Sequence, residues 1–257
     1  MSQVEQSGAR AAGVSDPARQ LGPLGRLAAL YRSSVGRKWV MALSGLAIFG
    51  FVVAHLLGTL KIFLGPGETD AYGEGLRDLG GDLVPSAHIL WILRVGLAFA
   101  FAVHIHAAFT LDRRNRLARP AGASRQQDYI AATYASRTML WSGVIVGLFI
   151  VFHIADLTWG ATNPDFVRGD VYNNQIASFQ NPAISAIYLA AVAALSLHLF
   201  HGLWSLFQSL GLSHPWLSVA VRRRAAATTA IAVGLGYASI PIAVLARILE
   251  HEPALAF

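Results

Sequence analysis

Residues 185–211 read SAIYLAAVAALSLHLFHGLWSLFQSLG, and this stretch decides the fold class. It contains no Asp, Glu, Lys or Arg. At 1.5 Å per residue its length is about 40 Å, more than the roughly 30 Å of a bilayer's hydrocarbon core, so it predicts a transmembrane helix. An unpaired polar group in lipid costs several kcal/mol. His198 and His201 therefore need partners inside the protein.

The composition agrees with a membrane protein. Hydrophobic residues make up 54% of the 257 residues and charged residues 13%, which excludes an ordinary soluble globule. Apolar runs of spanning length lie at about 36–63, 87–111, 138–160, 183–210 and 225–249. The predicted fold class is all-α, an integral membrane bundle of five transmembrane helices. No internal repeat is evident.

The positive charge is sorted by loop. The net charge of +6 would suit nucleic acid on a soluble fold, but we expect no such partner here, because fifteen of the twenty Lys and Arg residues lie in alternate connections. These basic segments precede the first span, join the second to the third, and join the fourth to the fifth. The positive-inside rule predicts a cytoplasmic N-terminus and an external C-terminus in the inner (cytoplasmic) membrane. Residues 1–23 read as a mobile cytoplasmic tail, and 24–34 as an amphipathic surface segment.

Histidines recur on four of the five spans. Helix rise places His55 and His153 about 28 and 24 Å from the inner end of their helices. His104 lies about 12 Å from that end, and His198 and His201 about 13–18 Å. Alternate helices of a four-helix bundle face each other across the core, so each level supplies a pair.

Paired imidazoles in an apolar shell suit haem b, whose iron takes two axial nitrogens. Zinc suits them poorly, because four tetrahedral ligands need equal heights. We therefore expect two stacked haems, about 10 Å apart in height and surrounded by the first four helices, with the fifth helix packed outside them. Haem propionates would find cations on the first two spans and the loop that follows. The candidates are Arg37, Lys38, Arg94, Arg113 and Arg114.

Several motifs together carry a family resemblance. They are GRKWVMALSG and FVVAHLLGTL in the first span, LWILRVGL and HIHAAFTLDRRNRLARP in the second, SGVIVGLFIVFHIADL in the third and HLFHGLWSLFQSLGL in the fourth. Across about 34–220 the chain resembles the single-chain, five-helix, di-haem cytochrome b anchor of the succinate dehydrogenase/fumarate reductase family. One departure is Gly58-Thr59, where the family usually has Gly-Asn.

The resemblance implies axial pairs of the first with the third helix and the second with the fourth. The position of His104 before Asn115 favours it over the alternate His106, and the Gly-Leu-Trp-Ser run after it favours His198 over the alternate His201. Residues 24–257 would then form one transmembrane cytochrome b domain.

The implied function is that of the membrane-anchor subunit of respiratory complex II. A cytoplasmic flavoprotein with FAD would act on succinate or fumarate. An iron–sulfur subunit would pass electrons to haem b, and a quinone, in particular menaquinone, would exchange them. This chain has no cysteine and no dinucleotide fingerprint, so it contributes no succinate chemistry itself. The resemblance is also compatible with a higher oligomer of the complex. The candidate quinone contacts are Tyr72, His88, Arg94 and Asp156 at an outer site, or Ser44, His201 and Trp204 at an inner one.

Asp156, one turn beyond His153, has three readings: it orients the imidazole, relays a proton, or is solvated. Two other functions also stay open. The histidines could ligate an iron–sulfur cluster completed by another chain's cysteines, or relay protons in a non-redox anchor or transporter. A haem-bearing anchor of another dehydrogenase is a variant of the first reading.

Overall fold

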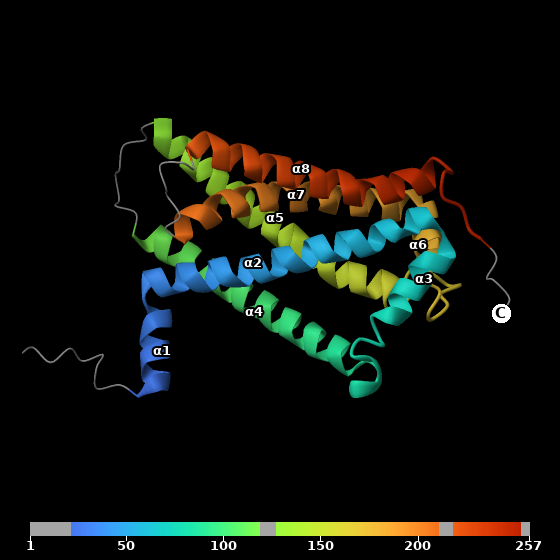
Figure 1. The fold of residues 1–257 in the computed structure, drawn as a ribbon. Coiled ribbons are helices and arrows are strands. Elements are labelled where there is room, and N and C mark those ends of the chain that lie inside the picture. Colours follow the sequence, from blue (N-terminus) through green and yellow to red (C-terminus); the bar gives the residue numbers. More distant parts are fainter. Residues whose placement is uncertain (1–21, 119–126, 211–217, 253–257) are drawn as a thin grey trace, which may run out of the picture.

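The computed structural model describes residues 22–118, 127–210 and 218–252, and every regular element in these ranges is a helix (Figure 1). Of the tail predicted at 1–23, residues 1–21 lie outside these ranges, and Pro23 is already the first residue of a helix. The α-helices are α1 (Pro23–Arg32), α2 (Ser34–Thr59), α3 (Pro66–Gly75), α4 (His88–Leu117), α5 (Gln127–Leu157), α6 (Val171–Gln180), α7 (Pro182–Ser209) and α8 (Val219–Leu245). Two short 3-10 turns, η2 (Leu60–Leu64) and η3 (Gly81–Leu83), follow α2 and α3.

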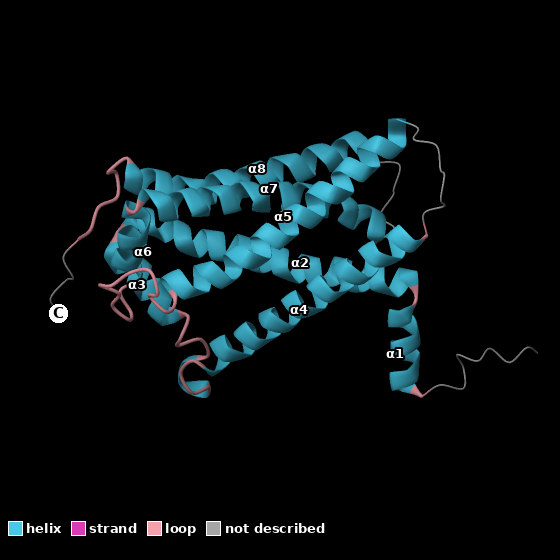
Figure 2. Cartoon of the chain, turned by 180° about the vertical axis from the view of Figure 1, so that it is seen from behind, coloured by secondary structure: helices cyan, strands magenta, loops and turns pink. Residues whose placement is uncertain are grey.

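Five helices are long and apolar enough to cross a membrane, as predicted. They are α2 with η2, α4, the part of α5 from Thr138 to Leu157, α7 and α8. The protein is therefore a multi-pass membrane protein. The helices lie side by side with their axes roughly aligned, as Figures 1 and 2 show from opposite sides. The main packing contacts join α2 to α4, α5 to α7, α7 to α8, and α2 to both α7 and α8.

A sharp corner separates α1 from the first span, because α1 runs across the direction of the bundle (Figure 1). Ser33 caps α2 by accepting a hydrogen bond from the amide of Gly36 at 2.9 Å. A Cβ on Gly36 would lie 1.9 Å from the carbonyl oxygen of Leu30, so only glycine fits this corner. The helix predicted at 24–34 is present, and its direction suits a place along a membrane surface.

The basic segments gather at one end of the bundle. This end holds α1, the start of α2, the end of α4 and the start of α8 (Figure 1). The opposite end holds α3, α6 and the segment after α8. The basic connections therefore lie together at one end of the bundle, which we call the basic end. We call the opposite end the outer end.

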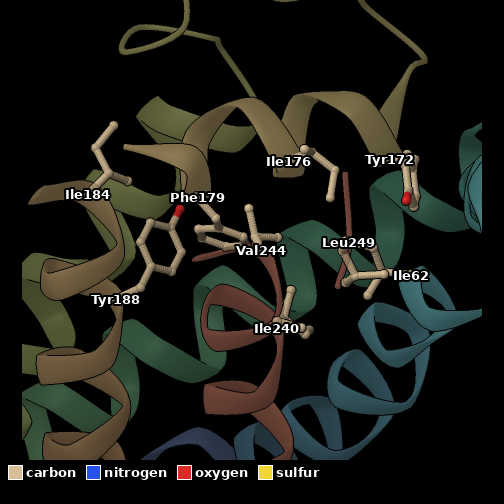
Figure 3. Close-up of a cluster of buried hydrophobic side chains, with 10 residues drawn as sticks. Ile62, Tyr172, Ile176, Phe179, Ile184, Tyr188, Ile240, Val244 and Leu249 are labelled. Atoms are coloured by element: carbon tan, nitrogen blue, oxygen red, sulfur yellow. The ribbon is translucent and has the colours of Figure 1, made fainter. Parts of the chain in front are cut away.

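The outer end is a packed cap, although its connecting segments contain many polar residues. Tyr172, Ile176 and Phe179 form one face of α6 and pack into a cluster with residues of η2, α7 and α8 (Figure 3). Their spacing of four and three is that of a buried helix face, hidden in the sequence by the polar residues between them. The polar segment between the third and fourth spans therefore contains a packed helix at 171–180.

Asp70 of α3 fixes α6 in this cap. Its carboxylate accepts hydrogen bonds from the amides of Val171 at 2.8 Å and Tyr172 at 3.0 Å, two orphan donors at the start of α6. Burial raises the pKa of Asp70 above its ordinary value, against the opposing effect of these two amides. The cap thus joins two connections that are about a hundred residues apart.

Candidate functional site

Two pairs of histidines face each other inside the bundle. The rings of His55 (α2) and His153 (α5) have centres 5.8 Å apart, at 73° to each other. The rings of His104 (α4) and His198 (α7) have centres 6.3 Å apart, at 71°. Each pair joins helices that stand opposite rather than next to each other in the pattern of main contacts. The structure thus brings together the four histidines in the pairing expected from their heights.

The inner pair, His104 and His198, is held by two serines. Ser44 lies 3.2 Å from Nδ1 of His104, and its hydroxyl donates to the carbonyl oxygens of Val40 and Met41. Ser142 lies 3.4 Å from Nδ1 of His198, and its hydroxyl donates to the carbonyl of Met139. A hydroxyl has one proton, so each serine must accept from Nδ1–H. This tautomer leaves Nε2 of both rings free to bind a metal.

The outer pair, His55 and His153, is held differently. Tyr188 lies 3.3 Å from Nδ1 of His153 and donates its own proton to Asp156 at 2.6 Å. Its oxygen therefore accepts from His153, and Nε2 of that ring is free. His55 stacks on Phe51, with ring centres 5.3 Å apart, and lies 6.1 Å from the ring of Tyr237. Tyr237 belongs to α8, so the fifth span contacts the outer pair instead of lying wholly outside the other four.

The two alternate histidines point elsewhere. His106 is exposed, and its Nδ1 is hydrogen-bonded to Tyr31 of α1, whose ring stacks on it with centres 5.9 Å apart. Nε2 of His201 lies 3.3 Å from the hydroxyl of Thr138. Neither ring belongs to a facing pair, so the geometry favours His104 and His198 at the inner level.

A short internal repeat, not evident from the sequence pattern alone, underlies the two pairs. A Cβ built on Gly45 would lie 3.2 Å from Cε1 of His104, and one built on Gly143 would lie 3.2 Å from Cε1 of His198. In both helices a Ser-Gly pair thus cradles an inner histidine. The shared pattern is Ser-Gly with a histidine eleven places after the serine, at 44, 45 and 55 in α2 and at 142, 143 and 153 in α5.

This repeat also sets the distance between the two levels. Because Ser44 is level with His104, and His55 lies eleven residues further along α2, the levels are about 16 Å apart along the helix. Counted along α2, this separation is larger than the 10 Å in height expected from the individual spans. Pairs at this separation cannot share one metal ion. Accordingly, the described residues contain no cluster of three or more His, Cys, Asp or Glu side chains that could hold one.

Asp156 is fully buried, so the reading of a solvated carboxylate is wrong. It accepts hydrogen bonds from Thr162, from Ser178 at 2.9 Å and from Tyr188. These donors come from the segment after α5, from α6 and from α7. Asp156 therefore ties the outer cap to the histidine that precedes it by one turn.

The other outer candidates do not converge on Asp156. Tyr72 packs on Gly58, where a Cβ would lie 2.4 Å from its ring and would displace it. His88 is at the start of α4, where Nδ1 lies 3.0 Å from the carbonyl oxygen of Pro85. Arg94 is exposed on α4 and lies over Trp91, 5.2 Å from the ring centre. The structure does not assemble these side chains into one outer quinone site.

The inner candidates lie around the basic end. Arg37 donates to the carbonyl of Tyr31 at 3.1 Å, and Lys38 and Arg113 are exposed. Arg114 reaches the hydroxyl of Ser34 at 3.5 Å. Trp204 has a buried indole N–H with no hydrogen-bond partner among the described residues, and Arg223 lies 5.9 Å from its ring centre.

Arg222, which the sequence analysis did not single out, also lies at this end. It is buried, with Nε unpartnered among the described residues. Three adjacent arginines at the start of α8 gave no signal that one of them is buried. Arg222 and Trp204 are thus two unsatisfied donors near the end where cofactor carboxylates were expected.

Fold and site together define a polytopic helical membrane protein with two facing histidine pairs. A comparison with protein-family models matches residues 113–238 to the succinate dehydrogenase/fumarate reductase transmembrane subunit family. This match, which covers just under half of the chain, supports placing it in this family. The matched segment includes His153 and His198, one member of each pair. Neither the curated proteins nor the solved structures gave a match.

Proposed function

We propose that this chain is the cytochrome b membrane anchor of a succinate:quinone oxidoreductase. In this role it takes electrons from a cytoplasmic iron–sulfur subunit, which a flavoprotein subunit reduces, and delivers them through two haems b to menaquinone. The observation that carries the proposal is the pair of facing imidazole pairs, with ring centres 5.8 and 6.3 Å apart. The family match supports the flavoprotein and iron–sulfur partners and a membrane setting.

The spacing of the rings fits axial ligation. An iron bound to one nitrogen of each ring at about 2.0 Å, with about 1.1 Å from nitrogen to ring centre, needs centres about 6 Å apart. Three of the four rings have Nδ1 engaged with a hydroxyl, which leaves Nε2 for the metal. The absence of cysteine removes any thiolate ligand from this chain. The donor set therefore fits bis-histidine haem b.

The chain's residues divide the work between binding and orientation. His104 and His198 would hold the inner haem, and His55 and His153 the outer one, while Ser44, Ser142 and Tyr188 fix the rings. Arg222 and Trp204 join Arg37 and Arg113 as donors for inner propionates. Haem b, when bound, supplies a one-electron carrier at each level. The apolar helix faces around the pairs keep water away from them.

The haem content of the whole complex gives the sharpest test of this function. The complex would be purified with its hydrophilic subunits, and a reduced-minus-oxidised spectrum with a haem-to-subunit ratio would be recorded. We expect sharp reduced bands of bis-histidine haem b and two haems per chain. An iron–sulfur cluster would lack these bands, and a non-redox anchor would carry no iron.

Activity of a variant completes the test. His104→Ala should reduce succinate-driven quinone reduction to below a tenth, while a soluble dye still accepts electrons from the hydrophilic subunits. The exposed His251, beyond α8, offers a matched control, and His251→Ala should behave as the unchanged protein. Full quinone activity in His104→Ala would contradict the proposal.

A further inference from the structure

Asp156 is a buried carboxylate without a cation. Its side chain has no exposed surface, and neither of the two ion pairs among the described residues involves it. An isolated charge in an apolar interior is costly unless hydrogen bonds satisfy it. Thr162, Ser178 and Tyr188 provide three such bonds. Each hydroxyl donates its single proton to the carboxylate, so the arrangement suits an ionised group with no proton of its own.

Tyr188 connects this carboxylate to His153. Its proton goes to Asp156, with 2.6 Å between the oxygens, so its oxygen accepts Nδ1–H of His153 at 3.3 Å. The tyrosine is further held by packing, because its ring lies edge-on to Phe179, with centres 4.8 Å apart (Figure 3). A continuous chain therefore runs from the carboxylate to the ring that faces His55.

In the part of the chain that the structure describes, no such charge lies behind the inner pair. His104 and His198 donate to serine hydroxyls, and those serines donate in turn to backbone carbonyls of their own helices. Both supports are neutral. His104, His198 and His153 thus share a free Nε2 but differ in what accepts the proton of Nδ1. Among the described residues, only His153 is linked through a phenol to an anion.

We propose that Asp156, acting through Tyr188, is a positioning residue for the outer pair that fixes the tautomer of His153 and places a negative charge behind it. This inference rests on the proposed function, in which a haem b is bound between His55 and His153. An anionic partner makes a ligating imidazole more basic and favours the more positive, oxidised state of the iron. The effect is local, because a charge acts most strongly over short distances in an apolar interior.

The experiment is a redox titration of both haems in the whole complex, comparing the unchanged protein with Asp156→Asn and Tyr188→Phe. Both variants should shift the outer haem toward the reduced state and leave the inner haem unchanged. For Asp156→Asn we expect the oxidised-to-reduced ratio of the outer haem at a fixed potential to fall about tenfold, equivalent to 59 mV for a one-electron couple. The double variant should shift no further than Asp156→Asn alone, because the two residues act as one chain.

Ser178→Ala provides the matched control. It removes one hydrogen bond from Asp156 but keeps the charge and the link through Tyr188, so the outer potential should move less than in Asp156→Asn. If Asp156→Asn instead loses the outer haem while keeping the inner one, recovery of that haem in Asp156→Glu would support the positioning role.

Three outcomes would overturn the inference. The first is an unchanged outer potential in Asp156→Asn with both haems present, which would leave the proposed function intact. The second is equal loss of both haems in Asp156→Asn and Tyr188→Phe, which would show a purely structural role. The third is absence of haem from the unchanged complex, which would overturn the proposed function together with this inference.

Discussion

Replacing Ser44 by alanine tests how the inner histidines are held. The change removes the oxygen that lies 3.2 Å from Nδ1 of His104 and leaves the helix backbone alone. A buried N–H that loses its acceptor costs about 1–3 kcal/mol. The carbonyl of Met41 also interacts with this ring and remains as an acceptor, so the lower part of that range applies. About 1–2 kcal/mol corresponds to a roughly 5- to 30-fold loss of affinity for the inner haem.

The assay follows the transfer of haem from the complex to excess apomyoglobin, with the two haems distinguished by their reduced spectra. The inner haem should leave about 5- to 30-fold faster in Ser44→Ala, while the outer haem leaves at its usual rate. Ser239→Ala in α8, whose hydroxyl donates to the carbonyl of Gly236 at 2.7 Å, is the matched control and should change neither rate. Equal rates for the inner haem in Ser44→Ala and the unchanged protein would refute the tautomer argument.

Three further predictions concern the cradle, the alternate ligand and the cap. Gly45→Ala puts a methyl 3.2 Å from the ring of His104, closer than an ordinary contact of about 3.5–4.0 Å. It should lower the affinity for the inner haem about tenfold. Gly50→Ala is the control, because open space surrounds Gly50, and it should leave this affinity unchanged. His201→Phe should leave the haem content at two per chain, since its ring faces Thr138; loss of a haem would make it the ligand. Burial raises the pKa of Asp70, so the folded protein binds this proton more tightly than the unfolded chain. The protonated Asp70 therefore stabilises the folded state below its ordinary pKa of 3.8, and this stabilisation is lost as the pH rises through the folded-state pKa. In thermal unfolding in detergent, Asp70→Asn should lack this pH dependence. The same pH profile in Asp70→Asn and the unchanged protein would contradict the prediction.

The spans and the two histidine levels follow from the sequence because a bilayer limits what a chain can do. A helix is the only way for a single apolar segment to satisfy its backbone in lipid, and its rise is fixed. Counting residues along a span therefore gives the height of His55 or His198 to within a few residues. The pairing of alternate helices then follows from bundle geometry.

The rotation of each helix does not follow from residue counting. His104 and His106 lie about 200° apart around α4, and which of them faces the core depends on how α4 packs. In the structure His106 is hydrogen-bonded to Tyr31 of α1, and His104 is hydrogen-bonded to Ser44 of α2. These contacts join residues up to 75 positions apart, which no local pattern specifies.

The supports of the histidines were also hidden, although one signal was available. The Ser-Gly pairs at 44–45 and 142–143 each precede an outer histidine by the same interval, and this repeat could have marked the serines. Tyr188 and the hydroxyls around Asp156 had no such mark, because hydroxyl residues are common in apolar helices and their partners lie on other elements. Their hydrogen bonds to Asp156 and His153 depend on the packing of α5, α6 and α7 in the cap, which the sequence does not specify locally.

The most direct measurement of the central claim is the haem content of four single alanine variants of the paired histidines. His55→Ala and His153→Ala should each lose the same haem, and His104→Ala and His198→Ala should each lose the other, as judged by reduced spectra and haem per chain. Loss of both haems to the same extent in all four variants, or loss of one haem shared by His55→Ala and His104→Ala, would contradict the two facing pairs.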